Sequence, residues 1–199
     1  MDISVVVPLY NEEESLPELF AWIERVMNAN GFSYEVIFVN DGSTDRSWQV
    51  IEQLQAQAPD KVRGIKFRRN YGKSPALFCG FEQAQGDVVI TMDADLQDDI
   101  DAMDKMVEKY KEGCGIVCGV RASRATDTFL KRTTARGYYG LMKLFGSDLI
   151  YDHADYRLMD TAALEALSHY HGDDLFLRGL VNRLGAKVGT VSYDRRARE

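Results

Sequence analysis

The chain contains few of the residues that build disulfide frameworks and histidine metal sites. Its 199 residues include three cysteines and three histidines. An odd number of cysteines without metal-ligand spacing predicts reduced, mostly buried thiols in the cytoplasm. The histidines are too scattered to form a metal site, and we assign them no role.

Long apolar runs are also missing. No stretch approaches the roughly 18 apolar residues that a membrane-spanning helix needs. Asp2 follows Met1 directly, and the first apolar run is only as long as a strand, so the sequence shows no signal peptide. A chain of this length is expected to form one large domain or two small ones, with a substantial core.

Positive charge is scarce overall but concentrated locally. The net charge of −7 argues against a nucleic-acid partner, because neutralising phosphates needs a basic face. The basic residues gather in two stretches, Arg121, Arg124, Lys131, Arg132 and Arg136 in one and Arg195, Arg196 and Arg198 in the other. An ordinary solvated face is one explanation of the first stretch; we favour anion binding, since arginine matches phosphate geometry.

Strand-like and helix-like segments alternate through Val120. Apolar runs predict strands over residues 3–8, 35–39, 62–67, 88–92 and 116–120, with helices between them. Ser43 or Thr44 is the expected cap of the second helix, and Ser74 the cap of the third, with Pro75 at its first position. Strict alternation predicts a parallel sheet with right-handed crossovers.

Beyond Val120 the pattern changes. A basic loop over residues 121–132, helices over 129–145, 162–170 and 175–184, an extended piece over 155–160 and a last strand over 187–193 are expected. We interpret residues 1–120 as a nucleotide-binding half and residues 121–199 as an acceptor-binding half of a single domain.

The strand over residues 88–92 ends abruptly in acidic residues. Asp93 and Asp95 follow it directly, at the sheet edge where open α/β sheets bind their ligands. Side chains two apart on an extended segment point the same way, so these carboxylates can converge. A divalent cation that bridges them to a substrate phosphate would relieve their repulsion, whereas a solvated acidic loop is the simpler alternative.

Other phosphate-binding motifs fit less well. Gly72-Lys73-Ser74 resembles the end of a P-loop, but Phe67 stands where that motif needs glycine. No Gly-x-Gly-x-x-Gly follows the first strand, so a dinucleotide fold is unsupported. An enzyme that forms a phosphoaspartate would account for Asp93 and Asp95 but would leave Asp41 unexplained.

Four segments, in this order, resemble family 2 glycosyltransferases: VVPLYNEE (6–13), NDGSTD (40–45), MDADLQD (92–98) and DYRLM (155–159). The resemblance covers essentially the whole chain and is greatest to the polyprenyl-phosphate branch. That branch includes dolichol-phosphate mannosyltransferases and bacterial undecaprenyl-phosphate glucosyl- or aminoarabinosyltransferases. The resemblance implies an α/β protein with the GT-A fold, a mostly parallel sheet flanked by helices, a metal-binding Asp-x-Asp motif and inversion at the sugar carbon.

The resemblance also implies roles for individual residues. Those expected to bind the nucleotide sugar are Pro8, Tyr10, Glu12, Asp41, Lys73 and Asp93. Those expected to hold Mg²⁺ or Mn²⁺ are Asp95 and Gln97. Those expected to bind the acceptor phosphate are Arg124, Lys131, Arg132 and Arg157. Those expected to act in catalysis are Asp95, Asp155 and Arg121. From the residues alone, Asp41 could equally be a turn residue and Lys73 a solvated lysine, while Glu13 and Glu14 are interpreted as acids at a helix start.

The role of Asp155 depends on the acceptor. A hydroxyl acceptor must lose a proton, and Asp155 is then the best candidate base. A phosphomonoester is already ionised near neutral pH, with a second pKa of about 6, so Asp155 need only orient Arg157 or a sugar hydroxyl. The alternatives to a polyprenyl phosphate acceptor are a saccharide hydroxyl and a non-catalytic nucleotide-sugar sensor or scaffold.

The resemblance places the reaction at the cytoplasmic face of the cell membrane, in cell-envelope polysaccharide biosynthesis. It favours UDP over GDP in the donor and leaves homo-oligomer formation open. Members of the branch usually continue beyond such an arginine-rich end into membrane helices, so we expect this chain to be the catalytic domain of a longer protein. By itself it is expected to be soluble, with Arg195, Arg196 and Arg198 docking on an anionic leaflet.

Overall fold

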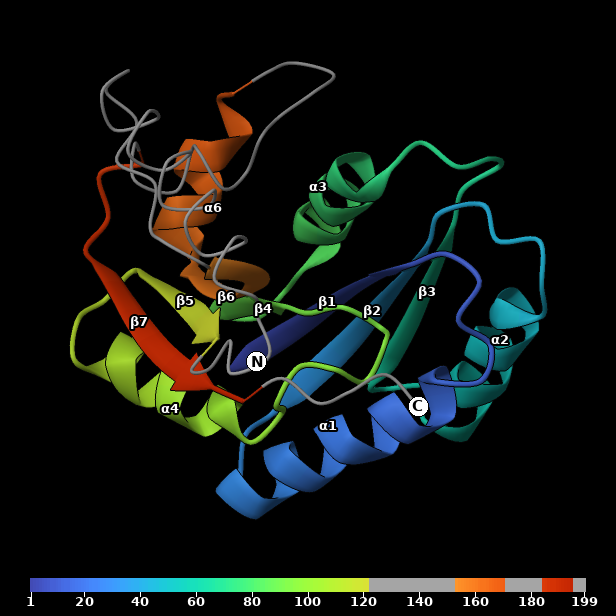
Figure 1. The fold of residues 1–199 in the computed structure, drawn as a ribbon, viewed down its shortest axis with the longest axis horizontal. Coiled ribbons are helices and arrows are strands. Elements are labelled where there is room, and N and C mark those ends of the chain that lie inside the picture. The colour runs from blue at the N-terminus through green and yellow to red at the C-terminus, as the bar shows by residue number, and fades with distance from the viewer. Residues whose placement is uncertain (122–152, 171–183, 195–199) are drawn as a thin grey trace, which may run out of the picture.

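The computed structural model describes residues 1–121, 153–170 and 184–194 (Figure 1). The elements along the chain are β1 (Ile3–Leu9), α1 (Leu16–Asn30), β2 (Tyr34–Asn40), α2 (Ser47–Gln57), β3 (Val62–Lys66), α3 (Lys73–Gln83), β4 (Val88–Thr91), α4 (Ala102–Lys111), β5 (Ile116–Arg121), β6 (His153–Asp160), α6 (Thr161–Ser168) and β7 (Val188–Tyr193). The strands form one seven-stranded sheet in the order β3-β2-β1-β4-β6-β5-β7. The predicted helices over 129–145 and 175–184, apart from Leu184, lie outside the described residues.

The alternation of strands and helices through β5 is confirmed, and so is the mostly parallel sheet. Strands β3, β2, β1 and β4 pair in parallel, as do β5 and β7. Strand β6 lies between β4 and β5 and is antiparallel to both. The extended piece predicted over 155–160 is therefore a strand inside the sheet, and it brings Asp155 beside the end of β4.

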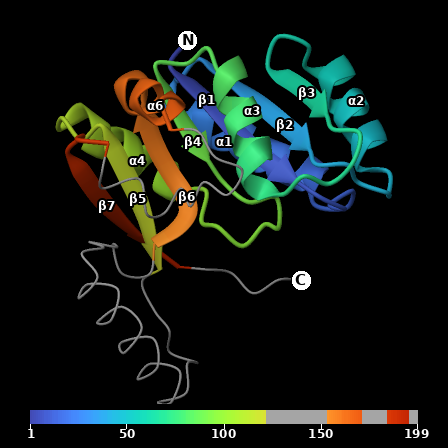
Figure 2. The ribbon, with the colours of Figure 1, turned by 90° about the horizontal axis from the view of Figure 1, so that it is seen from above.

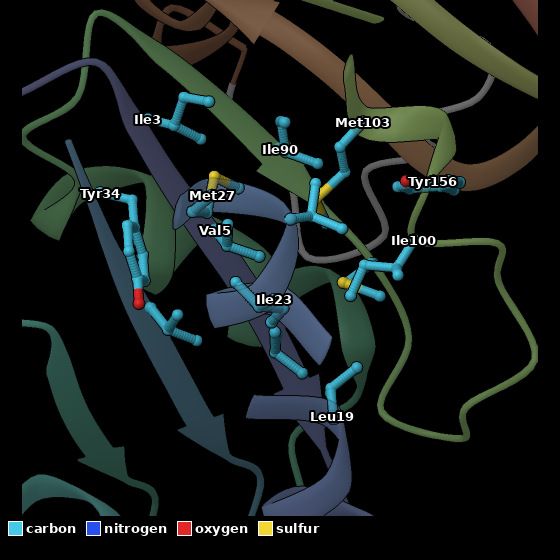
Figure 3. Packing of buried hydrophobic residues seen from close by; sticks show 14 of the residues in the cluster. Ile3, Val5, Leu19, Ile23, Met27, Tyr34, Ile90, Ile100, Met103 and Tyr156 are labelled. Carbon is cyan, nitrogen blue, oxygen red and sulfur yellow. The ribbon is translucent and has the colours of Figure 1, made fainter. Parts of the chain in front are cut away.

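Both faces of the sheet are buried by helices. Figures 1 and 2 show α3 and α6 over one face and α1 and α4 over the other. In β1, Ile3 and Val5 belong to the core cluster on the α1 side, whereas Val6 packs with Ala76 and Leu77 of α3. Figure 3 shows the α1-side cluster. Because the central strands β1, β2 and β4 are covered by helices on both faces, they are buried along their whole length and are mostly apolar rather than alternating.

Helix boundaries follow some of the expected signals and depart from others. Helix α1 ends at Gly31, which has a positive φ of 68° and donates its N–H to the carbonyls that close the helix, as expected. Helix α2 begins at Ser47, after Arg46, so neither Ser43 nor Thr44 caps it. The side chain of Asn40 instead accepts the N–H of Ser43 at 2.8 Å, which shapes a turn ahead of the helix.

The start of α3 is also displaced from the expected position. The helix begins at Lys73, with Gly72 before it at a φ of 98°, so Ser74 is not its cap and Pro75 is not its first residue. The left-handed conformation of Gly72 turns the chain sharply into the helix. Lys73 therefore stands at the first position of a helix that begins near the carboxyl end of the sheet.

Candidate active site

The loop after β2 holds the loop after β3 through Asp41. The Asp41 carboxylate is buried and accepts the backbone N–H of Tyr71 at 2.7 Å and that of Gly72 at 2.9 Å. Gly42 lies so close to this loop that an added Cβ would sit 2.3 Å from the carbonyl carbon of Arg69. Asp41 thus positions the segment that leads into Lys73, and its predicted contact with the donor stays a prediction.

The loop after β1 is bound to the loop after β2. The N–H of Asn11, a residue with a positive φ of 56°, donates to the hydroxyl of Ser43 at 2.9 Å. The N–H of Glu12 donates to the hydroxyl of Ser47 at 2.9 Å. These bonds fix the segment that contains Tyr10 against the start of α2, and they use the hydroxyl of Ser43 that was expected to cap that helix.

Glu13 and Asp45 join the same two loops. The N–H of Glu13 donates to the Asp45 carboxylate at 3.2 Å, and the Glu13 carboxylate accepts the N–H of Arg46 at 2.7 Å. Glu13 therefore binds the chain ahead of α2, which corrects its interpretation as an acid that serves the start of α1. Desolvation opposes ionisation of Asp45, but hydrogen bonds from Ser47 and Glu13 outweigh it and lower the pKa of this carboxyl.

A row of alternating charges crosses from α3 to β6. The Lys73 ammonium donates to Asp93, which follows β4, and to Asp155 on β6 at 2.8 Å. Arg157 donates to the other oxygen of Asp155 at 2.9 Å. Desolvation would lower the pKa of Lys73, but the charges of Asp93 and Asp155 outweigh it and raise the pKa above its usual value.

The members of this row differ in exposure. The Arg157 side chain is 2% exposed, that of Asp155 16%, and those of Lys73 and Asp93 38% each. The hydroxyl of Thr91 donates to the backbone carbonyl of Asp155, which fixes the register of β6 beside the end of β4. The row therefore has a buried, anchored end at Arg157 and an accessible end at Lys73 and Asp93, where a ligand can compete for the charges.

The acidic loop after β4 is closed by a residue that sequence reasoning missed. Asp98 is buried and accepts the N–H of Asp93 at 3.4 Å and the hydroxyl of Tyr193 at 2.8 Å. Within the loop, Leu96 has a positive φ of 58°, and Asp95 accepts the N–H of Gln97 at 3.2 Å. Burial and the neighbouring charge of Asp93 raise the pKa of Asp98.

Tyr193, the last residue of β7, was not predicted either. Its ring packs edge-on against that of Tyr156 at 5.3 Å, and the Tyr156 hydroxyl donates to the carbonyl of Asp99 at 3.1 Å. Desolvation and the charge of Asp98 raise the pKa of Tyr193. Nothing in the sequence marks a contact between residues 98 and 193, because only the sheet order brings β7 near the loop after β4.

The oxygen groups of this loop suit a hard divalent cation. In residues 1–121, 153–170 and 184–194, no group of three or more His, Cys, Asp or Glu side chains forms a complete metal cage. Mg²⁺ does not require one, since it usually takes one or two carboxylates and completes its shell with water and substrate phosphates. Asp95 and Gln97 offer such oxygens from one tight turn of this loop.

The structure brings some of the predicted residues together and leaves others apart. Those joined by direct side-chain contacts are Lys73, Asp93, Asp155 and Arg157. Pro8 is buried inside β1, paired with β2, whereas Tyr10 is exposed on the following loop. Arg121 ends β5 and pairs with Tyr193 across the strands. The remaining acceptor candidates, Arg124, Lys131 and Arg132, lie outside the described residues, as do the C-terminal arginines.

No helix in the part of the chain that the structure describes is long and apolar enough to cross a membrane.

Residues 4–168 match the model of glycosyl transferase family 2. An uncharacterised glycosyltransferase of Bacillus subtilis strain 168 is 45% identical over 98% of this chain and 60% of its own length. A bactoprenol glucosyl transferase of Shigella phage SfV is 36% identical over the whole chain and 64% of its own length. The chain thus spans roughly three fifths of these relatives.

Solved structures match the fold. Glucosyl-3-phosphoglycerate synthase from Mycobacterium tuberculosis, in complex with Mn²⁺, UDP and phosphoglyceric acid, aligns with a TM-score of 0.69 at 22% identity, over the whole chain and 71% of the other protein. S. aureus TarS 1-349 in complex with UDP aligns with a TM-score of 0.68 at 19% identity, over 98% of this chain and 59% of the other. At these identities the likeness establishes the GT-A fold.

Proposed function

Because this chain belongs to glycosyl transferase family 2, we propose that it transfers a sugar from a nucleotide-diphosphate sugar to a polyprenyl phosphate carrier, with inversion at the sugar carbon. The observation that carries the proposal is the charged row from Lys73 through Asp93 and Asp155 to Arg157, at the carboxyl edge of the sheet. Open α/β sheets bind ligands at this edge, and a diphosphate and a phosphate both need cations there.

The donor is assigned to the half of the site built by residues 1–120. Asp41 fixes the loop before α3, and the bonds between the first two loops fix the segment with Tyr10 and Glu12. A nucleotide laid across these loops would bring its diphosphate toward Lys73 and its sugar toward Asp93. We favour UDP as the nucleotide, which agrees with the UDP bound in two proteins of the same fold.

We assign Mg²⁺ or Mn²⁺ to Asp95, with Gln97 as a further oxygen ligand. When bound, the ion would stabilise the negative charge that develops on the leaving diphosphate. The bond between Asp95 and the N–H of Gln97 keeps the two residues in one tight turn. Two proteins of the same fold, the glucosyl-3-phosphoglycerate synthase and a mannosyltransferase from Pyrobaculum calidifontis, are in complex with Mn²⁺, which supports a metal of this kind.

The acceptor is assigned to residues of the second half, residues 121–199. We assign the lipid phosphate to Arg124, Lys131 and Arg132, with Arg157 adding positive charge from the buried end of the row, where Asp155 anchors it. An ionised phosphate oxygen attacks the sugar carbon as the bond from that carbon to the nucleoside diphosphate breaks, and no proton has to be removed. Lys73 and Arg157 both donate to the Asp155 carboxylate, which suits a residue that orients cations.

A polyprenyl phosphate lies in a bilayer, so we place the working protein at the cytoplasmic face of the membrane. A polybasic segment contributes about 1 kcal/mol per residue near an anionic leaflet, so Arg195, Arg196 and Arg198 would supply weak, reversible attachment. Flotation with anionic and neutral liposomes at low and high salt tests this attachment, and binding that ignores lipid charge would contradict it.

Transfer of labelled sugar from UDP-sugars to polyprenyl phosphate, compared with a polyprenol and a saccharide, tests the proposal. We expect product only on the phosphate and only with Mg²⁺ or Mn²⁺. Product on a free hydroxyl alone would refute the acceptor and make Asp155 the candidate general base. Nucleotide binding without transfer to any of these acceptors would favour a sensor or scaffold.

A further inference from the structure

Lys73 lies between two carboxylates, and the proposed reaction uses both of these carboxylates to bind other groups. Its ammonium donates to Asp93, from the loop after β4, and to Asp155 at 2.8 Å, from β6. Under the proposed function, Asp93 meets the donor sugar and Asp155 orients a cation for the acceptor. Because one ammonium binds both carboxylates, the donor sugar must compete with Lys73 for Asp93.

The backbone of Lys73 is held more firmly than the tip of its side chain. Its backbone is held firmly, because it starts α3 and because Asp41 accepts the N–H groups of Tyr71 and Gly72 just before it. Its side chain is 38% exposed and is held at the tip by its charged hydrogen bonds to Asp93 and Asp155. Asp93 is equally exposed, and an ion pair between two such groups is weak and can exchange for a stronger anionic partner. A diphosphate carries more negative charge than either carboxylate and is such a partner.

We propose that Lys73 is a displaceable counter-ion: it pairs Asp93 with Asp155 when the donor is absent and turns to the donor diphosphate when the donor binds. The inference rests on the proposed function and adds a switch to it. In the donor-free protein, the ammonium offsets one of the two negative charges of Asp93 and Asp155 and competes electrostatically with a divalent cation. In the donor complex, the same charge moves to the leaving group, Asp93 becomes available to the sugar, and Asp155 keeps Arg157 as its partner.

Two measurements separate this switch from a fixed structural clamp. The first compares binding of UDP and uridine, with Mn²⁺ present, by calorimetry and ligand-detected NMR. Lys73→Met is expected to weaken UDP binding about ten- to a hundredfold, as for loss of a charged hydrogen bond, and to leave uridine binding nearly unchanged. The second measures Mn²⁺ binding without nucleotide, by electron paramagnetic resonance of the free ion. Here Lys73→Met is expected to bind Mn²⁺ at least about threefold more tightly, because one nearby positive charge is gone.

Matched variants control for charge and folding. Lys66→Met removes an ammonium that lies 5.3 Å from the centre of the Trp48 ring, away from the carboxylates, and is expected to change neither measurement. Lys73→Arg keeps the charge and is expected to retain the preference for UDP over uridine. If Lys73→Met does not fold, the loss of that preference in Lys73→Arg would refute the switch.

The outcomes distinguish this inference from the proposed function. If the wild-type protein binds UDP with Mn²⁺, but Lys73→Met weakens UDP and uridine equally, Lys73 is a fixed clamp and the inference is wrong. An unchanged Mn²⁺ affinity in Lys73→Met would also overturn it, because the ammonium would then not compete with the ion. If the wild-type protein binds no nucleotide at all, the proposed function itself fails.

Discussion

Substitution of Gly42 by alanine tests how closely the donor loops must approach one another. Gly42 has a φ of +72°, and an added Cβ would lie 2.3 Å from the carbonyl carbon of Arg69, 2.6 Å from the nitrogen of Asn70 and 2.7 Å from the Cα of Arg69. All three neighbours are backbone atoms, so no side chain can rotate away. The loop after β3 must therefore move as a unit, and with it the N–H groups that Asp41 accepts.

The expected cost has two parts. A residue other than glycine in the left-handed region costs roughly 1–2 kcal/mol. Overpacking against atoms that cannot yield costs about 1–3 kcal/mol more. Gly42→Ala is thus expected to lower the free energy of unfolding by about 2–5 kcal/mol and to weaken UDP binding, because displacement of the loop also displaces Lys73.

Gly31→Ala is the matched control for this experiment. Gly31 has nearly the same φ, +68°, but nothing lies within 4 Å of its added Cβ, and it ends α1 away from the site. Equilibrium urea unfolding of both variants should show the extra destabilisation in Gly42→Ala, and calorimetry should show a loss of UDP affinity only there. Equal losses of stability, or unchanged UDP binding in Gly42→Ala, would refute the reasoning.

Three further changes test other parts of the site. Asp95→Asn should weaken Mn²⁺-dependent UDP binding at least about tenfold, because removing even a residue that only supports a metal ligand typically lowers metal affinity by that factor. The control Asp87→Asn changes an exposed residue just before β4 and should leave the calorimetric titration of UDP unaltered. Tyr193→Phe removes only the hydroxyl that donates to Asp98. Urea unfolding should show a free energy of unfolding lower by about 1–3 kcal/mol, and EPR should show a weaker Mn²⁺ affinity. Full retention of both the stability and the Mn²⁺ affinity would contradict a positioning role for Tyr193. Because folding lowers the pKa of Asp45, its carboxylate stabilises the fold above the unfolded pKa of about 3.9 and this contribution is lost as pH falls. Unfolding of Asp45→Ala should therefore show a deficit of about 1–3 kcal/mol at pH 7 that shrinks at pH 3, and a deficit independent of pH would refute this.

Much of the nucleotide-binding half could be predicted from the sequence, because its signals are local. Apolar runs that end in polar loops placed β1 to β5 correctly, since a strand buried on both faces must be apolar along its length. The parallel order then brought Asp41, Lys73 and Asp93 to one edge. Helix starts were less predictable. The hydroxyl of Ser43 accepts the N–H of Asn11 instead of capping α2, because the loop after β1 lies against it in the folded protein.

The parts that sequence reasoning missed depend on contacts between distant segments. Whether β6 extends the sheet at its edge or enters between β4 and β5 is decided by which strand edges remain for pairing, and no local pattern encodes that. Its insertion places Asp155 beside Lys73, 82 residues apart in sequence. The bond between Asp98 and Tyr193 spans 95 residues and exists only because β7 pairs with β5. Local sequence patterns therefore determined where the strands lie and which polar residues follow them. The order of strands in the sheet decided which charged residues pair across the site.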